Sequence, residues 1–209
     1  MASLLFAACA LVAFLAPAPA SAQQLAPDAL IRRITGEVLA AVRNDKDIRS
    51  GDEAKMHSLV ESKVLPYFDF RRATRVAMGL NWRRATPQQK ERLVLEFRSL
   101  LVRTYSGALA DVRDAKIEFV PLRMRPGDTE VTVRSRVSQA GAEPIVIAYD
   151  MEKAGPDWKV FDVRVGGVSL VATYRTSFAA EVRANGIEGL IRRLAGKTGA
   201  TAKRTLVGS

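Results

Sequence analysis

The 209-residue sequence has little of what metal sites, disulfides and thiol chemistry require, since it holds one cysteine, Cys9, and one histidine, His57. Cys9 lies in an apolar N-terminal run, so the chain beyond that run can form no disulfide and carries no thiol nucleophile. A single histidine cannot supply the several nitrogen or sulfur ligands of an ordinary zinc site. We therefore interpret His57 as an exposed or locally bonded side chain, and we expect neither a metal nor a cofactor.

Signatures of catalysis are also missing. The sequence contains no G-x-S-x-G elbow, no phosphate-binding glycine loop and no dinucleotide fingerprint. A serine triad would need His57 as its base, and nothing around His57 supports that role. Acidic pairs such as Asp111 and Asp114 look like the end of a helix and its turn. We predict that the protein is not an enzyme; an enzyme that uses only carboxylates is the alternative.

The first 22 residues have the pattern of a cleaved secretory signal peptide. Residues 4–16 are uncharged and largely apolar, and residues 20–22 form an A-x-A cleavage pattern. No Lys or Arg precedes the apolar run, which a start codon placed too far downstream would explain. The run is too short to span a bilayer, and Phe6 together with the short leader argues against a lipid-modified Cys9. We predict export, a single domain over residues 23–195 and a basic, disordered tail over residues 196–209.

The charge balance is basic. Lys and Arg number 32 against 22 Asp and Glu, which gives a net charge of +10. Such a field favours anionic partners. Export makes nucleic acid an improbable partner and leaves an anionic membrane surface or an acidic protein. Trp82, followed by Arg83 and Arg84, is a basic and amphipathic spot that suits an interface, although a solvated loop would look the same.

A long amphipathic helix is predicted from Thr86 to Asp111. Thr86 is a good N-cap, and Pro87 suits the first helical position. Apolar residues, among them Phe97 and Leu101, then recur at three- and four-residue steps and form a wide stripe. We expect this stripe to pack on a curved sheet built from residues 116–165. Further helices are expected from Pro27, after the charged break at residues 44–51, from Asp69 to Gly79, and after Ser169.

The hydrophobic period changes to two beyond Asp114, which predicts about four strands. Turn signals at residues 126–128, 139–143 and 155–157 separate them, so the strands should form an antiparallel meander with one face on the core. Helices grouped on one face of such a sheet define the α+β class. We further predict that helices and sheet enclose an apolar pocket for a lipid. Its predicted lining is Tyr67, Phe70, Met78, Phe97, Leu101, Tyr105, Val131, Val133, Ile145, Ile147, Tyr149, Phe161, Val163, Val168, Tyr174 and Phe178.

Several ordered motifs resemble the MlaC/Ttg2D ("toluene tolerance") family of periplasmic phospholipid-binding proteins. They include the segments at residues 65–70 (LPYFDF), 85–89 (ATPQQ), 97–105 (FRSLLVRTY), 158–163 (WKVFDV) and 186–190 (GIEGL). The resemblance extends over roughly residues 29–194. It implies an NTF2-like curved sheet with helices packed on its concave face, and no catalytic residue.

The same resemblance implies a function and partners. The expected function is a periplasmic carrier that shuttles phospholipids between inner- and outer-membrane complexes and so maintains outer-membrane lipid asymmetry. The expected partners are an inner-membrane ABC transporter complex with a lipid-binding ring subunit and an outer-membrane lipoprotein–porin complex, with the carrier itself a monomer. A carrier of hopanoids or other polyprenoids is the alternative within the family, and an NTF2-like enzyme with a pocket carboxylate is the alternative outside it.

Overall fold

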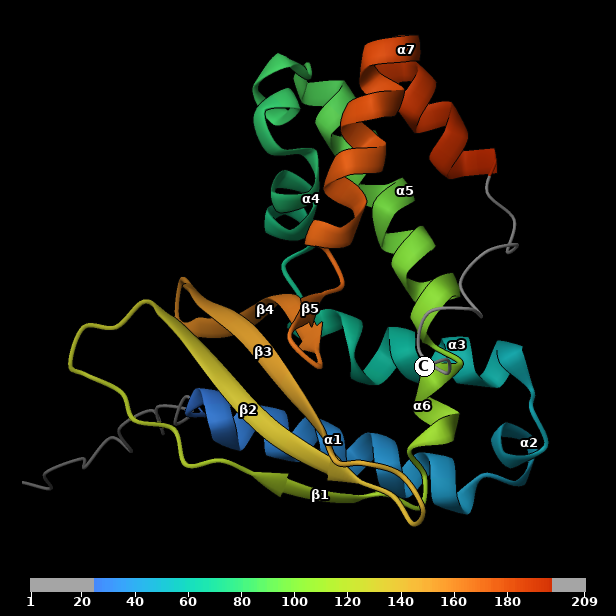
Figure 1. Ribbon diagram of the computed structural model, residues 1–209, viewed down its shortest axis with the longest axis vertical. Coiled ribbons are helices and arrows are strands. Elements are labelled where there is room, and N and C mark those ends of the chain that lie inside the picture. Colours follow the sequence, from blue (N-terminus) through green and yellow to red (C-terminus); the bar gives the residue numbers. More distant parts are fainter. Residues whose placement is uncertain (1–24, 197–209) are drawn as a thin grey trace, which may run out of the picture.

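The computed structural model describes residues 25–196, so the predicted leader and the tail beyond Gly196 lie outside the described residues. Helices and strands follow one another as α1 (Pro27–Asn44), α2 (Lys46–Arg49), α3 (Glu53–Lys63), η1 (Leu65–Tyr67), α4 (Phe70–Met78), η2 (Gly79–Arg84), α5 (Pro87–Tyr105), α6 (Ala108–Asp111), β1 (Lys116–Phe119), β2 (Glu130–Ser138), β3 (Ile145–Ala154), β4 (Asp157–Val165), β5 (Val168–Ser169), η3 (Ala172–Tyr174) and α7 (Arg175–Gly196). This mixture of helices and one sheet confirms the α+β class (Figure 1).

The five strands form one open antiparallel sheet in the order of the sequence. The four expected strands are present, and β5 is an addition that the sequence analysis missed. β5 follows Gly166 and Gly167, whose φ angles of 57° and 86° allow the chain to turn back at once onto β4. A β-bulge at Asp150/Met151 interrupts the pairing of β3 with β4, and bulges of this kind bend a sheet.

Local sequence signals set where several helices begin and end. Thr86 and Gln89 form a capping box at the start of α5, and the Asp69 carboxylate accepts a hydrogen bond from the Arg72 N–H at 2.8 Å at the start of α4. Gly79, with φ of 54°, ends α4. These three boundaries agree with the sequence prediction.

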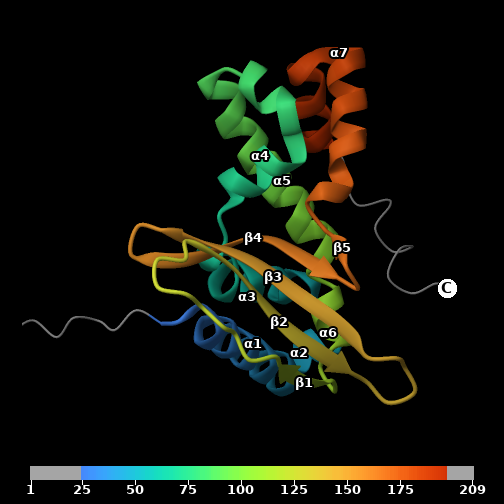
Figure 2. The ribbon, with the colours of Figure 1, turned by 60° about the vertical axis from the view of Figure 1, so that its left-hand side comes forward.

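The predicted long helix is two helices, because the chain leaves the α5 spiral at residues 106–107 and α6 follows as a separate turn. Its predicted partner is also wrong. The buried residues of α5, which include Leu93 and Phe97, pack against α4 and α7 rather than against the sheet. In both views, α4, α5 and α7 form a group on the side of β4 and β5, while α1 lies along one face of the sheet (Figures 1 and 2).

The interior is divided into three apolar clusters. The helical cluster joins α4, α5 and α7 around Phe97, Phe178 and Leu190. The sheet cluster joins α1 to the sheet and includes Ile31 and Met151. The corner cluster joins α1, α2 and α3 around Val38, Val42, Ile48 and Met56. The fold therefore has three small apolar cores rather than one.

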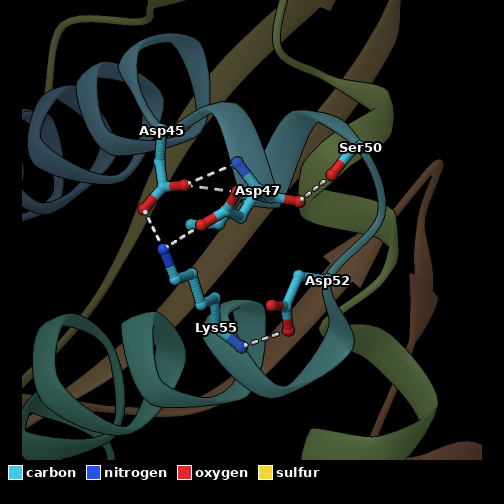
Figure 3. A network of polar contacts seen from close by, with 6 residues as sticks. Asp45, Asp47, Ser50, Asp52 and Lys55 are labelled. Atoms are coloured by element: carbon cyan, nitrogen blue, oxygen red, sulfur yellow. Dashed lines mark hydrogen bonds and ion pairs between the residues drawn. The ribbon is translucent and has the colours of Figure 1, made fainter.

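A network of polar contacts joins α2 to the start of α3 beside the corner cluster (Figure 3). Asp45 accepts hydrogen bonds from the N–H groups of Asp47 at 2.9 Å and Ile48 at 3.2 Å, and Asp52 accepts one from the Lys55 N–H at 3.0 Å. The Lys55 ammonium group pairs with Asp45 and Asp47, and the bond from Ile48 holds the pKa of Asp45 below its usual value. The charged break predicted at residues 44–51 therefore contains the short helix α2, which Asp45 caps.

Arg72 ties α4 to the sheet. Its guanidinium group pairs with Glu130 at 2.7 Å and with Glu152, and it lies 3.8 Å from the ring centroid of Phe161. The side chains of Arg72 and Glu152 are only 16% and 17% exposed. This contact holds the helical group against the ends of β2 and β3.

Candidate lipid-binding site

One face of the sheet is apolar and carries much of the predicted lining. Val133 pairs with Tyr149, and Tyr149 pairs in turn with Val163, so their side chains lie on the same face. The same register adds Val131, Ile145 and Ile147. Leu30 and Ile31 of α1 cover part of this face. The alternation in the sequence therefore assigned these six residues to a common surface.

Tyr149 lies near the middle of this apolar face. Burial raises the pKa of its phenol, so the group is neutral at physiological pH. Its polar neighbours are the hydroxyls of Ser135 and Thr35, and the Ser135 Oγ is buried without a hydrogen bond of normal geometry. The face thus holds an uncharged polar spot among apolar side chains, and Ser135 and Thr35 are residues that the sequence analysis did not select.

A second group of predicted lining residues belongs to the helical cluster. Phe97 and Phe178 are buried, with ring centroids 5.2 Å apart, and Phe97 makes a similar edge contact with Tyr174. Met78 is also buried there. Leu101 and Tyr174 are only partly buried against the same cluster. The structure therefore brings the predicted residues together in two groups rather than in a single lining.

Tyr105, at the end of α5, lies close to Tyr174. Burial raises the pKa of the Tyr105 phenol well above its usual value, and the neighbouring Tyr174 adds to the shift. Tyr105 and Tyr149 therefore offer hydrogen-bonding groups without charge. Neutral polar groups of this kind can fix the orientation of an apolar ligand at low desolvation cost.

The remaining predicted residues occupy more peripheral positions. Phe70 stacks on Phe68 with ring centroids 5.7 Å apart, and Phe161 lies beneath the guanidinium of Arg72. Tyr67 borders the sheet cluster. Val168 is 60% exposed, and Ile145, at one end of the apolar face, is 45% exposed. Their contact with a lipid stays a prediction, as does that of the whole predicted set.

Two arginines of α1 lie over aromatic rings at the border of the sheet cluster. Arg32 is 4.5 Å from the ring centroid of Phe119, and Arg33 is 5.4 Å from that of Tyr67. The Arg33 Nη2 also donates a hydrogen bond to the Tyr67 Oη at 3.1 Å. The sequence analysis did not select these two arginines. The signal was present, because both arginines directly follow Leu30 and Ile31 in the same helix.

Two hollows lie on the surface of the described region. One, of about 310 Å³, lies between α4, η2 and the β3–β4 hairpin, and the other, of about 420 Å³, lies between β2 and the segment before it. Of the predicted lining residues, Val131 alone borders either of these two hollows. The enclosed apolar pocket therefore stays a prediction that lipid binding must test.

Among residues 25–196, two carboxylates are buried, and both are held by structural hydrogen bonds. Asp162 accepts hydrogen bonds from the Ser169 hydroxyl at 2.5 Å and from the Val171 N–H at 3.2 Å, and burial raises its pKa. It pairs across the sheet with Asp150, so it lies on the face opposite Tyr149. Glu181 accepts a hydrogen bond from Asn185 and pairs with Arg193. Neither carboxylate lies on the apolar face where a pocket acid would be needed.

Within residues 25–196, no group of three or more His, Cys, Asp or Glu side chains is placed to hold a metal ion. Over the same range, no helix combines the length and the apolar character needed to cross a membrane.

An open antiparallel sheet whose apolar face is partly covered by α1, with a separate group of helices beside it, defines a small α+β protein with its candidate site on that face. The chain belongs to the MlaC family, since the family model described as "MlaC protein" matches residues 32–196. This confirms the resemblance seen in the sequence motifs.

Known relatives agree with this assignment. The chain is 22% identical over 187 residues to the intermembrane phospholipid transport system binding protein MlaC of Haemophilus influenzae, a match that covers 88% of this chain and 87% of the relative. It is 24% identical over 178 residues to the toluene tolerance protein ttg2D of Pseudomonas putida, covering 85% and 82% of the two chains.

A solved structure is more similar in sequence. The phospholipid-binding protein from Ralstonia solanacearum, determined in complex with a phospholipid, is 40% identical to this chain and superposes with a TM-score of 0.74. The match covers 80% of this chain and 94% of the other. The NTF2-like description is compatible with the shared fold.

Proposed function

We propose that this protein is a periplasmic carrier of phospholipids that shields the acyl chains of its cargo while they cross between membranes. The main support is the 40% identical protein whose structure contains a phospholipid. The names of the curated relatives point in the same direction. On this chain, the apolar face around Val133, Tyr149 and Val163 is the proposed surface for the tails.

Such a carrier must shield the hydrocarbon chains of its cargo from water. At about 0.8 kcal/mol per buried CH₂, two chains of about sixteen carbons represent roughly 25 kcal/mol of transfer free energy. A carrier works only if its interior matches the bilayer closely, so that loading and release are both nearly neutral. Neutral phenols such as Tyr105 and Tyr149 suit this task better than ionised groups, which would lose their hydration beside the tails.

We infer that the headgroup stays near solvent, where cations such as Arg32 and Arg33 lie at the border of the sheet cluster. The proposed partners are an inner-membrane ABC transporter complex with a lipid-binding ring subunit and an outer-membrane lipoprotein–porin complex. The proposed role is one of binding and transfer without catalysis, because the two buried carboxylates are held in hydrogen bonds away from the apolar face.

Native mass spectrometry tests the proposal on protein produced in a Gram-negative periplasm and purified without detergent. We expect a population whose added mass is that of a phospholipid, and extraction followed by lipid analysis would identify it. If the extract contained a hopanoid or another polyprenoid instead, that lipid and not a phospholipid would be the cargo. Protein that is uniformly free of lipid would contradict the carrier function.

A further inference from the structure

One segment of the chain carries positive charge without any acidic residue. Residues 70–90 hold six cations and no Asp or Glu. Within the described part of the chain, Arg72 pairs with Glu130 and Glu152, and Arg71 pairs with Glu91. The cations of the segment that form no ion pair within residues 25–196 are Arg75, Arg83, Arg84 and Lys90.

The same segment presents an isolated apolar side chain. Leu80 in η2 is 83% exposed, which is the highest value among the large apolar residues that lie on the surface of the described region. Two residues further on, the ring of Trp82 is half-buried. The Arg71 guanidinium is 5.7 Å from the centroid of this ring and the Lys90 Nζ is 5.6 Å from it. An aromatic ring held among cations, next to a protruding leucine, is typical of side chains at a membrane–water boundary.

The hollow of about 310 Å³ adds a place for an anionic group beside this segment. Arg71, Arg75, Trp82 and Lys153 are among its lining residues. The cations of its lining, which also include Arg72, outnumber its two carboxylates, Asp69 and Glu152. The charge that remains for a ligand in this hollow is therefore positive.

We propose that the α4–η2 patch, which consists of Arg71, Arg75, Leu80, Trp82, Arg83 and Arg84, docks the protein on the surface of an anionic bilayer. Leu80 enters the headgroup region, and the arginines contact lipid phosphates there. A bilayer suits the patch better than a folded partner does. A stable protein interface buries about 800 Å² on each side around an apolar centre, whereas this patch offers one leucine and one half-buried tryptophan among dispersed cations.

This docking goes beyond the proposed carrier function and does not depend on it, because it concerns the outer surface rather than the bound cargo. Co-sedimentation of the purified full chain with vesicles measures it. The vesicles contain either phosphatidylcholine alone or equal parts of phosphatidylcholine and phosphatidylglycerol. We expect binding to the anionic vesicles, weakened by added salt, and little binding to the neutral ones.

Variants of exposed patch residues identify the surface that binds. Each cation near an anionic surface contributes about fivefold in affinity, which corresponds to about 1 kcal/mol. Arg75→Ala with Arg83→Ala should therefore weaken binding by more than about tenfold, and Leu80→Ser should weaken it further. The charge-matched control is Arg123→Ala with Arg125→Ala, and the apolar control is Met124→Ser, since these three exposed residues lie in the β1–β2 connection. Both controls should bind as the unchanged protein does.

Equal loss of binding in patch and control variants would overturn the proposal, because net charge alone would then explain the attraction. Absence of binding to anionic vesicles would overturn it as well, and would leave an acidic protein as the partner for these cations. The lipid content of each variant, measured by native mass spectrometry, separates the two hypotheses. Protein that carries lipid but does not bind vesicles would contradict the docking alone. Protein that is free of lipid but binds vesicles would contradict the carrier function alone.

Discussion

Tyr149 is the residue whose substitution tests the apolar face most directly. A lysine there would place a charge among Val133, Val163 and the side chains of α1, where an acyl chain could no longer pack without desolvating it. We expect Tyr149→Lys to lower lipid occupancy by about tenfold or more, because burial of an unpaired charge costs several kcal/mol. Native mass spectrometry measures the occupancy.

Val146→Lys is the matched control for this substitution. Val146 lies on the same strand, is 41% exposed and points to the opposite face. The control should keep normal occupancy, and Tyr149→Phe should keep it too because the aromatic surface is retained. Normal occupancy in a folded Tyr149→Lys protein would remove this residue from the lipid site.

The stability of the protein should depend on pH through Asp162, because burial raises the pKa of this carboxyl group. A carboxyl group whose pKa is higher in the folded than in the unfolded state favours folding in its protonated form. Its contribution to stability is therefore largest below the unfolded pKa, and it declines as pH rises from that value through the raised folded pKa. Asp162→Asn should remove this decline. Urea unfolding of both proteins across the acidic range measures it, and parallel pH profiles would show that the carboxyl does not titrate as inferred.

The backbone conformation of α7 depends on one glycine, Gly186. Gly186 interrupts this helix with φ of 70° and ψ of −179°, a conformation that is essentially restricted to glycine. Gly186→Ala should destabilise the protein by about 1–3 kcal/mol. A Cβ at this position would meet no heavy atom within 4 Å, so the cost is one of backbone conformation alone.

Gly36→Ala is the corresponding control, since Gly36 lies within α1 and its added Cβ would also meet nothing within 4 Å. Alanine at a regular helical position should raise stability by about 0.5–1 kcal/mol. Chemical denaturation of both variants gives the two free energies of unfolding. Similar effects of the two substitutions would contradict the strained backbone at Gly186.

The elements also show which structural features the sequence could predict. Helix starts at Asp69 and Thr86 and the faces of β2 and β3 depend on neighbouring residues or on alternation, and all of these were predicted correctly. The break at residues 106–107 was not, because the apolar spacing continues across it. The two-residue strand β5 is too short to leave a periodic signal.

Predictions about which elements pack against each other were less accurate. Periodicity identifies the apolar stripe of α5 but not what covers it, and α4 and α7 cover it instead of the sheet. Phe97 and Tyr149 lie in separate apolar clusters, and that both contact one lipid stays a prediction. The sequence therefore predicted the faces of single elements better than their assembly into a site.

At the scale of the whole molecule, bound lipid should stabilise the fold. A ligand that binds only the folded state raises the free energy of unfolding with its concentration and affinity. We expect protein stripped of lipid to unfold at a lower temperature than protein purified with its cargo, and reloading from phospholipid micelles to reverse the change. Thermal unfolding followed by circular dichroism measures both states. Identical curves for stripped and loaded protein would contradict a lipid held within the fold.

The division of the interior into three clusters determines where this molecule can open locally. The helical cluster shares no helix with the other two clusters, whereas α1 belongs to both the sheet cluster and the corner cluster, so local separation is easiest along the boundaries of the helical cluster. Amide hydrogen exchange should accordingly be slowest inside each cluster and faster along those boundaries. A long hydrocarbon chain could then enter or leave between two clusters by a local separation, while every cluster stays folded throughout.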